Sequence, residues 1–194
     1  MMRKRSYKIL LISLLISGIF STAEATESIK IAAIFAKTGI AVSHNAPHIQ
    51  IVELAVEEIN NQGGLLGRPV ELIIIDNKSS PVGSSIAAKK AVQLQVPAVI
   101  GASWSSHSLQ MAPVLQQAEI PMITGSSTNP KVTRIGNYIF RTCFIDSFQA
   151  KSMAQFAYTD LGARTAIVLE IINEEFSLTL AELFVRSFQH NRES

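Results

Sequence analysis

Apolar segments with two different spacings alternate along the chain from residue 28 onward. Short apolar runs, several of them rich in β-branched residues, predict strands. They cover residues 28–35, 70–75, 97–101, 120–124 and 165–171, and 138–142 is expected to be extended. Apolar residues recur at helical spacing in 51–59, 84–95, 106–118, 147–161 and 177–189. Strands that alternate with helices in this way indicate βαβ units. The predicted fold class is therefore α/β, a doubly wound parallel sheet.

Local signals set the ends of the first helix. Asn45 is a plausible N-cap and Pro47 suits the first turn. Gly63 and Gly64 stop the helix. The strand that follows, 70–75, is almost continuously apolar, which is typical of a parallel strand covered on both faces by helices.

The first 25 residues have the layout of a secretory signal peptide. A basic head at 3–8 precedes an apolar stretch at 9–20, and Ala23-Glu24-Ala25 fits a small-x-small cleavage site. The apolar stretch is shorter than the about 20 residues that span a bilayer, which favours a cleaved signal over an uncleaved anchor. No Cys follows the stretch to carry a lipid. We expect Sec-dependent export to the periplasm, with no membrane insertion after cleavage.

Composition excludes several classes of protein. With 47% hydrophobic and 16% charged residues, the chain is neither a disordered tail nor a coiled coil. The formal charge of +2 lies in the leader, so nothing in the remainder suggests binding to nucleic acid. The single Cys143 excludes an internal disulfide and a Cys-based zinc site, and we expect it to be a small buried residue.

Two loops that follow predicted strands are rich in hydroxyl side chains. Residues 101–107 are Gly-Ala-Ser-Trp-Ser-Ser-His and directly precede a helix, and residues 125–130 are Gly-Ser-Ser-Thr-Asn-Pro. Hydroxyl and backbone N–H groups at a helix N-terminus suit a carboxylate or a phosphate. Ordinary capping explains one such loop without any ligand. In a doubly wound sheet both loops face the same crevice, and this favours a ligand site.

No motif predicts an enzyme or a cofactor. The Gly-x-Ser-x-Gly elbow, the phosphate-binding loop and the dinucleotide fingerprint are all missing from the sequence. His44 and His48 have the spacing of a metal pair on a helix, but Pro47 lies between them and no third ligand is apparent. His107 beside Ser105 could act as a base, although packing or capping at the helix start is the preferred interpretation.

Two further features have ordinary explanations. Trp104 can be a packed core residue or the wall of a pocket, since it lies in a candidate ligand loop. Glu174 and Glu175 are adjacent, so their side chains diverge on a helix and are expected to be solvated.

Four segments, in order and at family spacing, resemble the leucine/isoleucine/valine-binding family of type 1 periplasmic binding proteins. They are 58–72 (Glu-Ile-Asn-Asn-Gln-Gly-Gly-Leu-Leu-Gly-Arg-Pro-Val-Glu-Leu, followed by Asp76 and Pro81), 100–106, 123–130 and 140–149. The resemblance implies a bilobed receptor that closes on an amino acid or similar small carboxylate. It also implies delivery of that ligand to the membrane permease of an ABC transporter.

The resemblance assigns roles to individual residues. Ser105 is similar to a family Ser whose hydroxyl and amide hold the ligand carboxylate, and Thr128 to a Thr that holds polar ligand atoms. Ser126 matches a position whose backbone carbonyl accepts from the ammonium. Ser103 and Trp104 would line the pocket beside it.

Three more residues complete the expected ligand set. Ser127 belongs to the same loop as Thr128, His44 lies near a pocket aromatic of the family, and Phe176 stands where the second lobe often has Tyr. His44 and Phe176 depart from the family pattern, and Phe176 lacks the phenol hydroxyl that would make one polar contact.

The resemblance implies a ligand-binding lobe at 26–143 and the start of a second lobe at 144–194. The family's second-lobe acidic residue for the ligand ammonium has no counterpart in this sequence. We interpret the chain as truncated, and we expect open sheet faces and strand edges where the rest of such a receptor would pack. Alternatives are a sensory ectodomain of the same fold, an exported hydrolase that uses Ser105 and His107, and a chain that binds nothing.

Overall fold

The computed structural model describes residues 27–193 and contains one parallel sheet. Its five strands have the order β2-β1-β3-β4-β5, and each neighbouring pair is parallel. The strands are β1 (Ile29–Phe35), β2 (Val70–Asp76), β3 (Val99–Gly101), β4 (Met122–Thr124) and β5 (Ile139–Arg141). This arrangement confirms the predicted α/β fold class. The predicted signal peptide lies outside the described residues.

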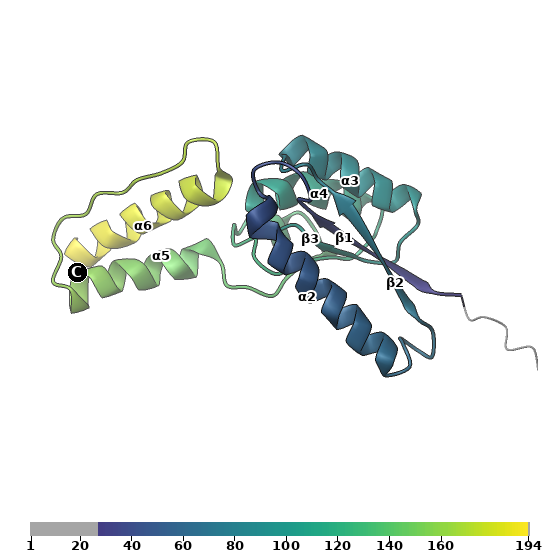
Figure 1. The fold of residues 1–194 in the computed structure, drawn as a ribbon. Helices are drawn as coiled ribbons and strands as arrows, with labels where there is room; N and C mark the ends of the chain where they lie inside the picture. Colours follow the sequence, from purple (N-terminus) through teal and green to yellow (C-terminus); the bar gives the residue numbers. More distant parts are fainter. Residues whose placement is uncertain (1–26, 194) are drawn as a thin grey trace, which may run out of the picture.

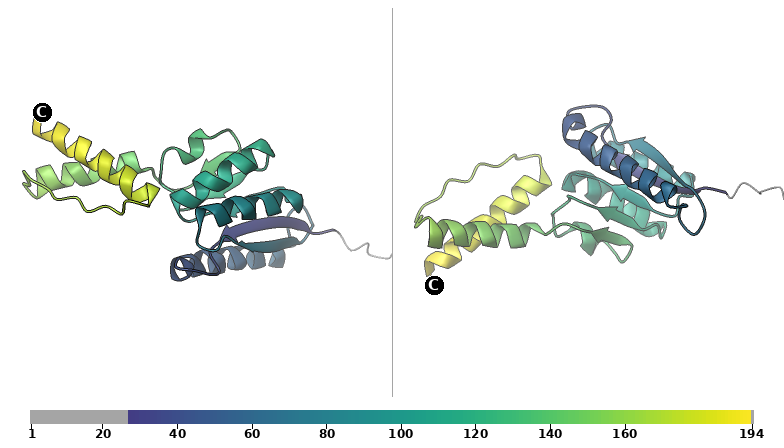
Figure 2. Two further views of the ribbon diagram at one scale, coloured as in Figure 1. Left: turned by 90° about the horizontal axis from the view of Figure 1, so that it is seen from above. Right: turned by 60° about the horizontal axis from the view of Figure 1, so that its bottom comes forward.

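Helices cover the two faces of the sheet unequally. The helices are α2 (Val42–Asn61), α3 (Pro81–Gln93), α4 (Ser105–Gln117), α5 (Asp146–Gln155) and α6 (Glu175–Glu193), with short turns at η1 (Val132–Arg134) and η2 (Phe156–Asp160). Helices α3 and α4 lie on one face and α2 lies alone on the other (Figure 2). Helices α5 and α6 pack against each other and project away from the sheet, beyond the carboxyl ends of its strands (Figure 1).

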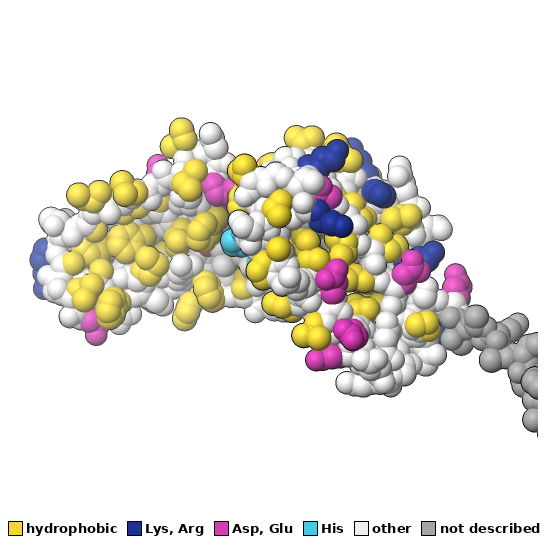
Figure 3. Space-filling model, viewed as in Figure 1, with side chains coloured by type: hydrophobic (Ala, Val, Ile, Leu, Met, Phe, Trp, Pro, Cys, Tyr) yellow, Lys and Arg dark blue, Asp and Glu magenta, His cyan; other side chains and the backbone are white. Residues whose placement is uncertain are grey.

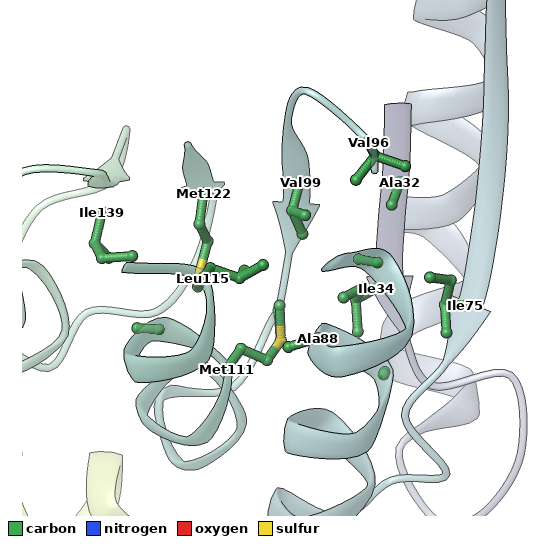
Figure 4. Packing of buried hydrophobic residues seen from close by; sticks show 14 of the residues in the cluster. Ala32, Ile34, Ile75, Ala88, Val96, Val99, Met111, Leu115, Met122 and Ile139 are labelled. Carbon is green, nitrogen blue, oxygen red and sulfur yellow. The ribbon is translucent and has the colours of Figure 1, made fainter. Parts of the chain in front are cut away.

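The hydrophobic core lies between the sheet and the α3–α4 layer (Figure 4). Strand residues Ile34, Val99 and Met122 meet Met111 and Leu115 of α4, and all five are fully buried. Helix α3 contributes alanines, which let it approach the sheet closely. Burial of each large side chain stabilises the fold by about 1.5–3 kcal/mol. The core therefore holds α4 against the sheet, and the loop after β3 ends where this helix begins.

The first helix begins earlier than its sequence signals predict. Ala41 is its N-cap residue, and the Ser79 hydroxyl accepts the Ala41 N–H at 3.0 Å. Asn45 therefore lies inside α2 and Pro47 in its second turn, so both predicted positions are wrong. The buried Asn45 side chain instead accepts from the Ala36 N–H at 3.1 Å and donates to the Ala41 carbonyl at 2.9 Å.

The predicted end of this helix is confirmed. Helix α2 stops at Asn61, and Gly64 adopts a φ of 79°, where a Cβ would collide with the Arg68 carbonyl. Asn60 joins the helix end to the start of β2 through Val70: its amide donates to the Val70 carbonyl at 2.9 Å and accepts the Val70 N–H at 2.7 Å. Glycine permits this close approach of the turn, and the Asn60 side chain holds the turn to β2.

The predicted strand at 165–171 is wrong. These residues form an irregular connection from η2 to α6, and Ile167 and Leu169 are 92% and 91% exposed. A strand needs a neighbouring strand to satisfy its backbone N–H and C=O groups. The five-stranded sheet lies at one end of the α5–α6 pair, and none of its strands pairs with this segment (Figure 1).

Part of the sheet is uncovered, as expected. Ile123 and Phe140 alternate with buried neighbours on β4 and β5, and they remain 40% and 49% exposed on the face opposite the core. On α2, Ile51 and Leu54 are 65% and 55% exposed, so its apolar stripe is only partly buried. Among residues 27–193 no helix is long and apolar enough to cross a membrane.

Candidate functional site

A cavity of about 720 Å³ lies at the carboxyl ends of the strands, where the sheet meets the start of α6. Its walls come from residues that follow β1 and β2, from the loops after β3 and β4, and from residues between Phe144 and Phe176. This is the position at which doubly wound sheets bind ligands.

The loop after β3 is shaped by its own hydroxyl groups. Ser108 Oγ accepts the Ala102 N–H at 3.2 Å, which folds the loop back onto the first turn of α4. Trp104 is extended at the N-cap position, and its carbonyl accepts the N–H groups of His107 and Ser108 at 3.1 and 3.0 Å. The first N–H groups of a helix have no intrahelical acceptor, and the helix dipole is positive at this end. The start of α4 therefore suits an anion.

Hydrogen bonds join the two hydroxyl-rich loops into one unit. Ser127 Oγ lies 2.7 Å from Ser108 Oγ and donates to the Ala102 carbonyl at 3.1 Å. Ser126 Oγ donates to the Ser103 carbonyl at 3.0 Å. In the other direction, Ser105 Oγ accepts the Asn129 N–H at 3.2 Å. The two loops therefore lie side by side at one rim, as the sequence predicts.

The structure brings together most of the predicted ligand residues. Those that line the cavity are His44, Ser103, Trp104, Ser105, Ser126, Thr128 and Phe176. Ser127 is outside the lining and fully buried, because its hydroxyl is used to bond the two loops. Its place in the ligand set has no support in this geometry, whereas the roles of the others remain predictions.

Thr128 and Asp146 hold buried polar atoms at the crossing from the sheet to α5. Thr128 Oγ1 and both carboxylate oxygens of Asp146 are buried without a hydrogen bond of normal geometry. Burial raises the pKa of Asp146, while the nearby Thr128 hydroxyl and the Arg141 guanidinium act in the opposite direction. The backbone is well anchored here, since the Asp146 N–H donates to the Thr128 carbonyl at 3.0 Å. Thr128 thus places a hydroxyl at the cavity with the Asp146 carboxylate beside it.

Aromatic rings form one wall of the cavity. The centroid of Trp104 lies 5.2 Å from that of His107 and 6.1 Å from that of His44. His44 stacks on His48 at 5.5 Å, and His48 stacks on Phe35 at 5.8 Å. Trp104 therefore lines the cavity, and its ring also packs against His44 and His107. No group of three His, Cys, Asp or Glu side chains in the described chain is placed to hold a metal ion.

His107 is a neutral part of this wall. Asn77 Oδ1 accepts the Ser79 N–H at 3.0 Å, which orients the amide so that its Nδ2 donates to His107 Nδ1 at 3.2 Å. Burial lowers the pKa of His107 to about 4, so the ring is uncharged near neutral pH. Ser105 accepts from Asn129 rather than pairing with His107, and this arrangement does not favour a Ser–His nucleophile.

The predicted ligand set missed several polar residues of the cavity lining, namely Ser79, Ser106, Gln149, Asn173 and Glu174, and Glu174 is the acidic one among them. Its Oε2 accepts a hydrogen bond from Ser106 Oγ at 3.1 Å, and its Oε1 is buried without a partner. The expectation of a solvated side chain is therefore wrong for Glu174. Glu175 fits it, since its exposed carboxylate lies 3.6 Å from Lys131 Nζ. The available signal was position, because Glu174 is two residues before Phe176.

The start of α6 is held by both loops. Asn129 Nδ2, from the loop after β4, donates to Thr179 Oγ1 at 2.9 Å and contacts the Glu175 carbonyl at 3.5 Å. Ser106, after β3, holds Glu174. The cavity is closed on this side because α6 docks on the same two loops that line its floor.

Comparison with known proteins gives the family. A family model described as periplasmic binding protein matches residues 28–192. The chain is 30% identical over 155 residues to the leucine-, isoleucine-, valine-, threonine- and alanine-binding protein of Pseudomonas aeruginosa, covering 79% of this chain and 42% of that protein. It is 30% identical over 138 residues to the Leu/Ile/Val-binding protein of Escherichia coli K12, covering 71% and 38%.

Solved structures agree in fold. A leucine-binding protein from Thermotoga maritima superposes with a TM-score of 0.79 at 36% identity, covering 84% of this chain and 46% of that one. A branched-chain amino acid transporter substrate-binding protein from Streptococcus pneumoniae, solved with isoleucine, gives 0.77 at 27% identity, covering 85% and 47%. The chain belongs to the periplasmic binding protein family. It spans less than half the length of these relatives.

Proposed function

We propose that this chain forms the ligand-binding part of an exported receptor that takes up an amino acid or similar small carboxylate for an ABC transporter. The observation that carries the proposal is the joining of two hydroxyl-rich loops at one cavity, which Ser105, Ser126 and Thr128 line. The relatives bind leucine, isoleucine and valine by name, and this supports the ligand class.

The proposed mechanism uses two parts of the chain in sequence. The lobe at 26–143 captures the carboxylate with the first N–H groups of α4 and with the hydroxyls of Ser105 and Thr128. The part at 144–194 then closes over the ligand and expels water. A membrane permease recognises the closed form, and the leader at 1–25 directs export to the periplasm.

Titration of the purified chain with amino acids tests this function. Trp104 is the single tryptophan and lines the cavity, so its fluorescence reports binding directly. Ser105→Ala and Thr128→Ala each remove one hydrogen bond to a charged ligand group, which weakens binding by about 1–3 kcal/mol. Ser152→Ala, on an exposed position of α5, is the matched control and keeps wild-type affinity. Wild-type affinity in both cavity variants would contradict the proposal.

A further inference from the structure

The connection from η2 to α6 contains a stretch of free backbone between two anchored ends. At one end, the Ala163 N–H donates to the Ala157 carbonyl at 2.9 Å. At the other end, the Ile171 N–H donates to Ser177 Oγ at 2.8 Å. Between these anchors, no hydrogen bond in the described part of the chain uses the backbone of residues 164–170. The connection runs along the α5–α6 pair with no strand beside it (Figure 1).

The side chains of this stretch suit a β-strand. Residues 164–170 are Arg-Thr-Ala-Ile-Val-Leu-Glu, a segment without Gly or Pro that is rich in β-branched and apolar residues. Ile167 and Leu169 fall on the same face of an extended strand, and they are 92% and 91% exposed. An exposed segment of this composition with unpaired backbone groups is prone to pair with a strand of another chain.

The charges of the stretch indicate which chain fits. Arg164 and Glu170 lie at its two ends, each three residues from Ile167. An antiparallel pair of two copies centred on Ile167 therefore sets Arg164 of each copy opposite Glu170 of the other. A parallel pair in register would set like charges side by side, which is destabilising. The stretch is thus complementary to a second copy of itself in the antiparallel direction.

Both charged groups are available for such a pair. Arg164 donates to the Tyr158 and Ala163 carbonyls at 3.0 and 3.1 Å, and both bonds use Nη1. Its guanidinium also lies 4.1 Å from the centre of the Tyr158 ring. These contacts leave Nε and Nη2 for a carboxylate. Glu170 is exposed, and neither ion pair of the described chain includes it.

We propose that two copies of this chain associate by antiparallel pairing of residues 164–170, with Ile167 of one copy opposite Ile167 of the other. The pair joins the free backbone groups along one edge of each stretch, in the isologous contact that a two-fold dimer requires. The interface is small, so the association is weak and is best measured through the proximity of defined positions. The inference does not depend on the proposed function, since none of residues 164–170 lines the cavity.

Crosslinking that depends on the register tests the pairing. Cys143→Ser first removes the single native thiol. In that background, Ile167→Cys places the two introduced thiols directly opposite each other, whereas Leu169→Cys places each opposite Thr165 and too far from the other to form a disulfide. Under mild oxidation we expect Ile167→Cys to form the linked dimer about tenfold faster or more, because pairing raises the effective concentration of its thiols. Both positions are almost fully exposed, so random collisions affect them alike, and equal rates would overturn the proposal.

Charge reversal gives a second measurement on the same crosslink. With Ile167→Cys retained, Glu170→Arg and Arg164→Glu each set like charges opposite one another, so each variant alone should lose most of the fast crosslinking. A mixture of the two sets opposite charges at both ends, and linked dimers with one copy of each variant should form at close to the original rate. A mixture that does not recover, although both variants are folded by circular dichroism, overturns the proposal. If Arg164→Glu does not fold, because its contacts with Tyr158 are lost, the comparison of Ile167→Cys with Leu169→Cys decides alone.

Discussion

His107 shows at the residue scale how the cavity wall depends on a neutral ring. It is 2% exposed and bonded to Asn77, and burial lowers its pKa to about 4. In the unfolded chain the ring takes up a proton near pH 6.5, whereas the folded protein resists it. Between pH 4 and pH 6.5 the unfolded chain therefore binds more protons than the folded protein. The free energy of unfolding consequently rises with pH across this interval.

We expect stability to fall as the pH is lowered from 7 towards 4. After allowance for screening by water in the cavity, the His107 contribution is about 1–2 kcal/mol of unfolding free energy, present above pH 6.5 and lost on approach to pH 4. Urea unfolding followed at several pH values measures it. His107→Gln, which cannot become charged, should give a flatter pH dependence in this interval. Parallel curves for the two proteins would show that the ring does not control it.

Most of the cavity-lining residues that the sequence predicted lie in the two hydroxyl-rich loops. Hydroxyl groups in the β3 and β4 loops were predictable, because parallel strands bring the loops that follow them to one edge. Glu174 was not, because its burial depends on where α6 docks, and that is decided by Ser106 and Asn129 far away in the sequence. Ser127 was predicted as a ligand residue, but its hydroxyl bonds Ser108 across the two loops. Sequence alone does not show that contact.

At the scale of elements, one side chain joins the end of α2 to the start of β2. Asn60 bonds both backbone groups of Val70, which starts the strand next to β1. These bonds fix the position of the first residue of β2 relative to the end of α2. The segment 58–72 was singled out from the sequence, but the role of its first Asn became clear only from the structure.

Asn60→Ala should destabilise the protein. The substitution removes two hydrogen bonds at 2.7 and 2.9 Å. The expected loss is about 1–3 kcal/mol of unfolding free energy, measured by chemical denaturation. Asn61→Ala is the control: Asn61 is the adjacent exposed residue at the helix end, and no side-chain bond is described for it, so little change is expected. Equal losses in the two variants would contradict a specific role for the Val70 contact, because Ala is a better helix former than Asn and helix propensity alone causes no loss.

Elements were predictable where their partners are present in the described chain. Strands β1 to β5 all pair within one sheet, and the apolar runs in the sequence predicted each of them. The run at 165–171 has the same composition, yet Ile167 and Leu169 are exposed because no strand lies beside them. Apolar pattern records a tendency to form a strand, and pairing decides whether one forms.

At the scale of the whole molecule, large apolar side chains are exposed on the α5–α6 part and on one face of the sheet. Figure 3 shows hydrophobic side chains gathered over the α5–α6 part, and Phe148 and Phe156 there are 65% and 55% exposed. The sheet adds Ile123 and Phe140 on its uncovered face, and β5 has an open edge. Exposed apolar side chains gathered on one part of a surface favour packing against other protein. The matched part covers 46% and 47% of the two solved relatives.

The purified chain should therefore bind a hydrophobic dye such as ANS and self-associate as its concentration rises. The open face of β4 and β5 exposes apolar side chains beside an unpaired strand edge, and both features favour association between copies. Sedimentation velocity across a concentration series and ANS fluorescence measure the effect. Ile123→Lys combined with Phe140→Lys should reduce both signals, because charges on an exposed face and edge oppose pairing. Asn61→Lys adds a charge at an exposed polar position and should leave them unchanged. A monomer without ANS signal over the whole series would mean that the apolar face is too dispersed to act as a surface for association.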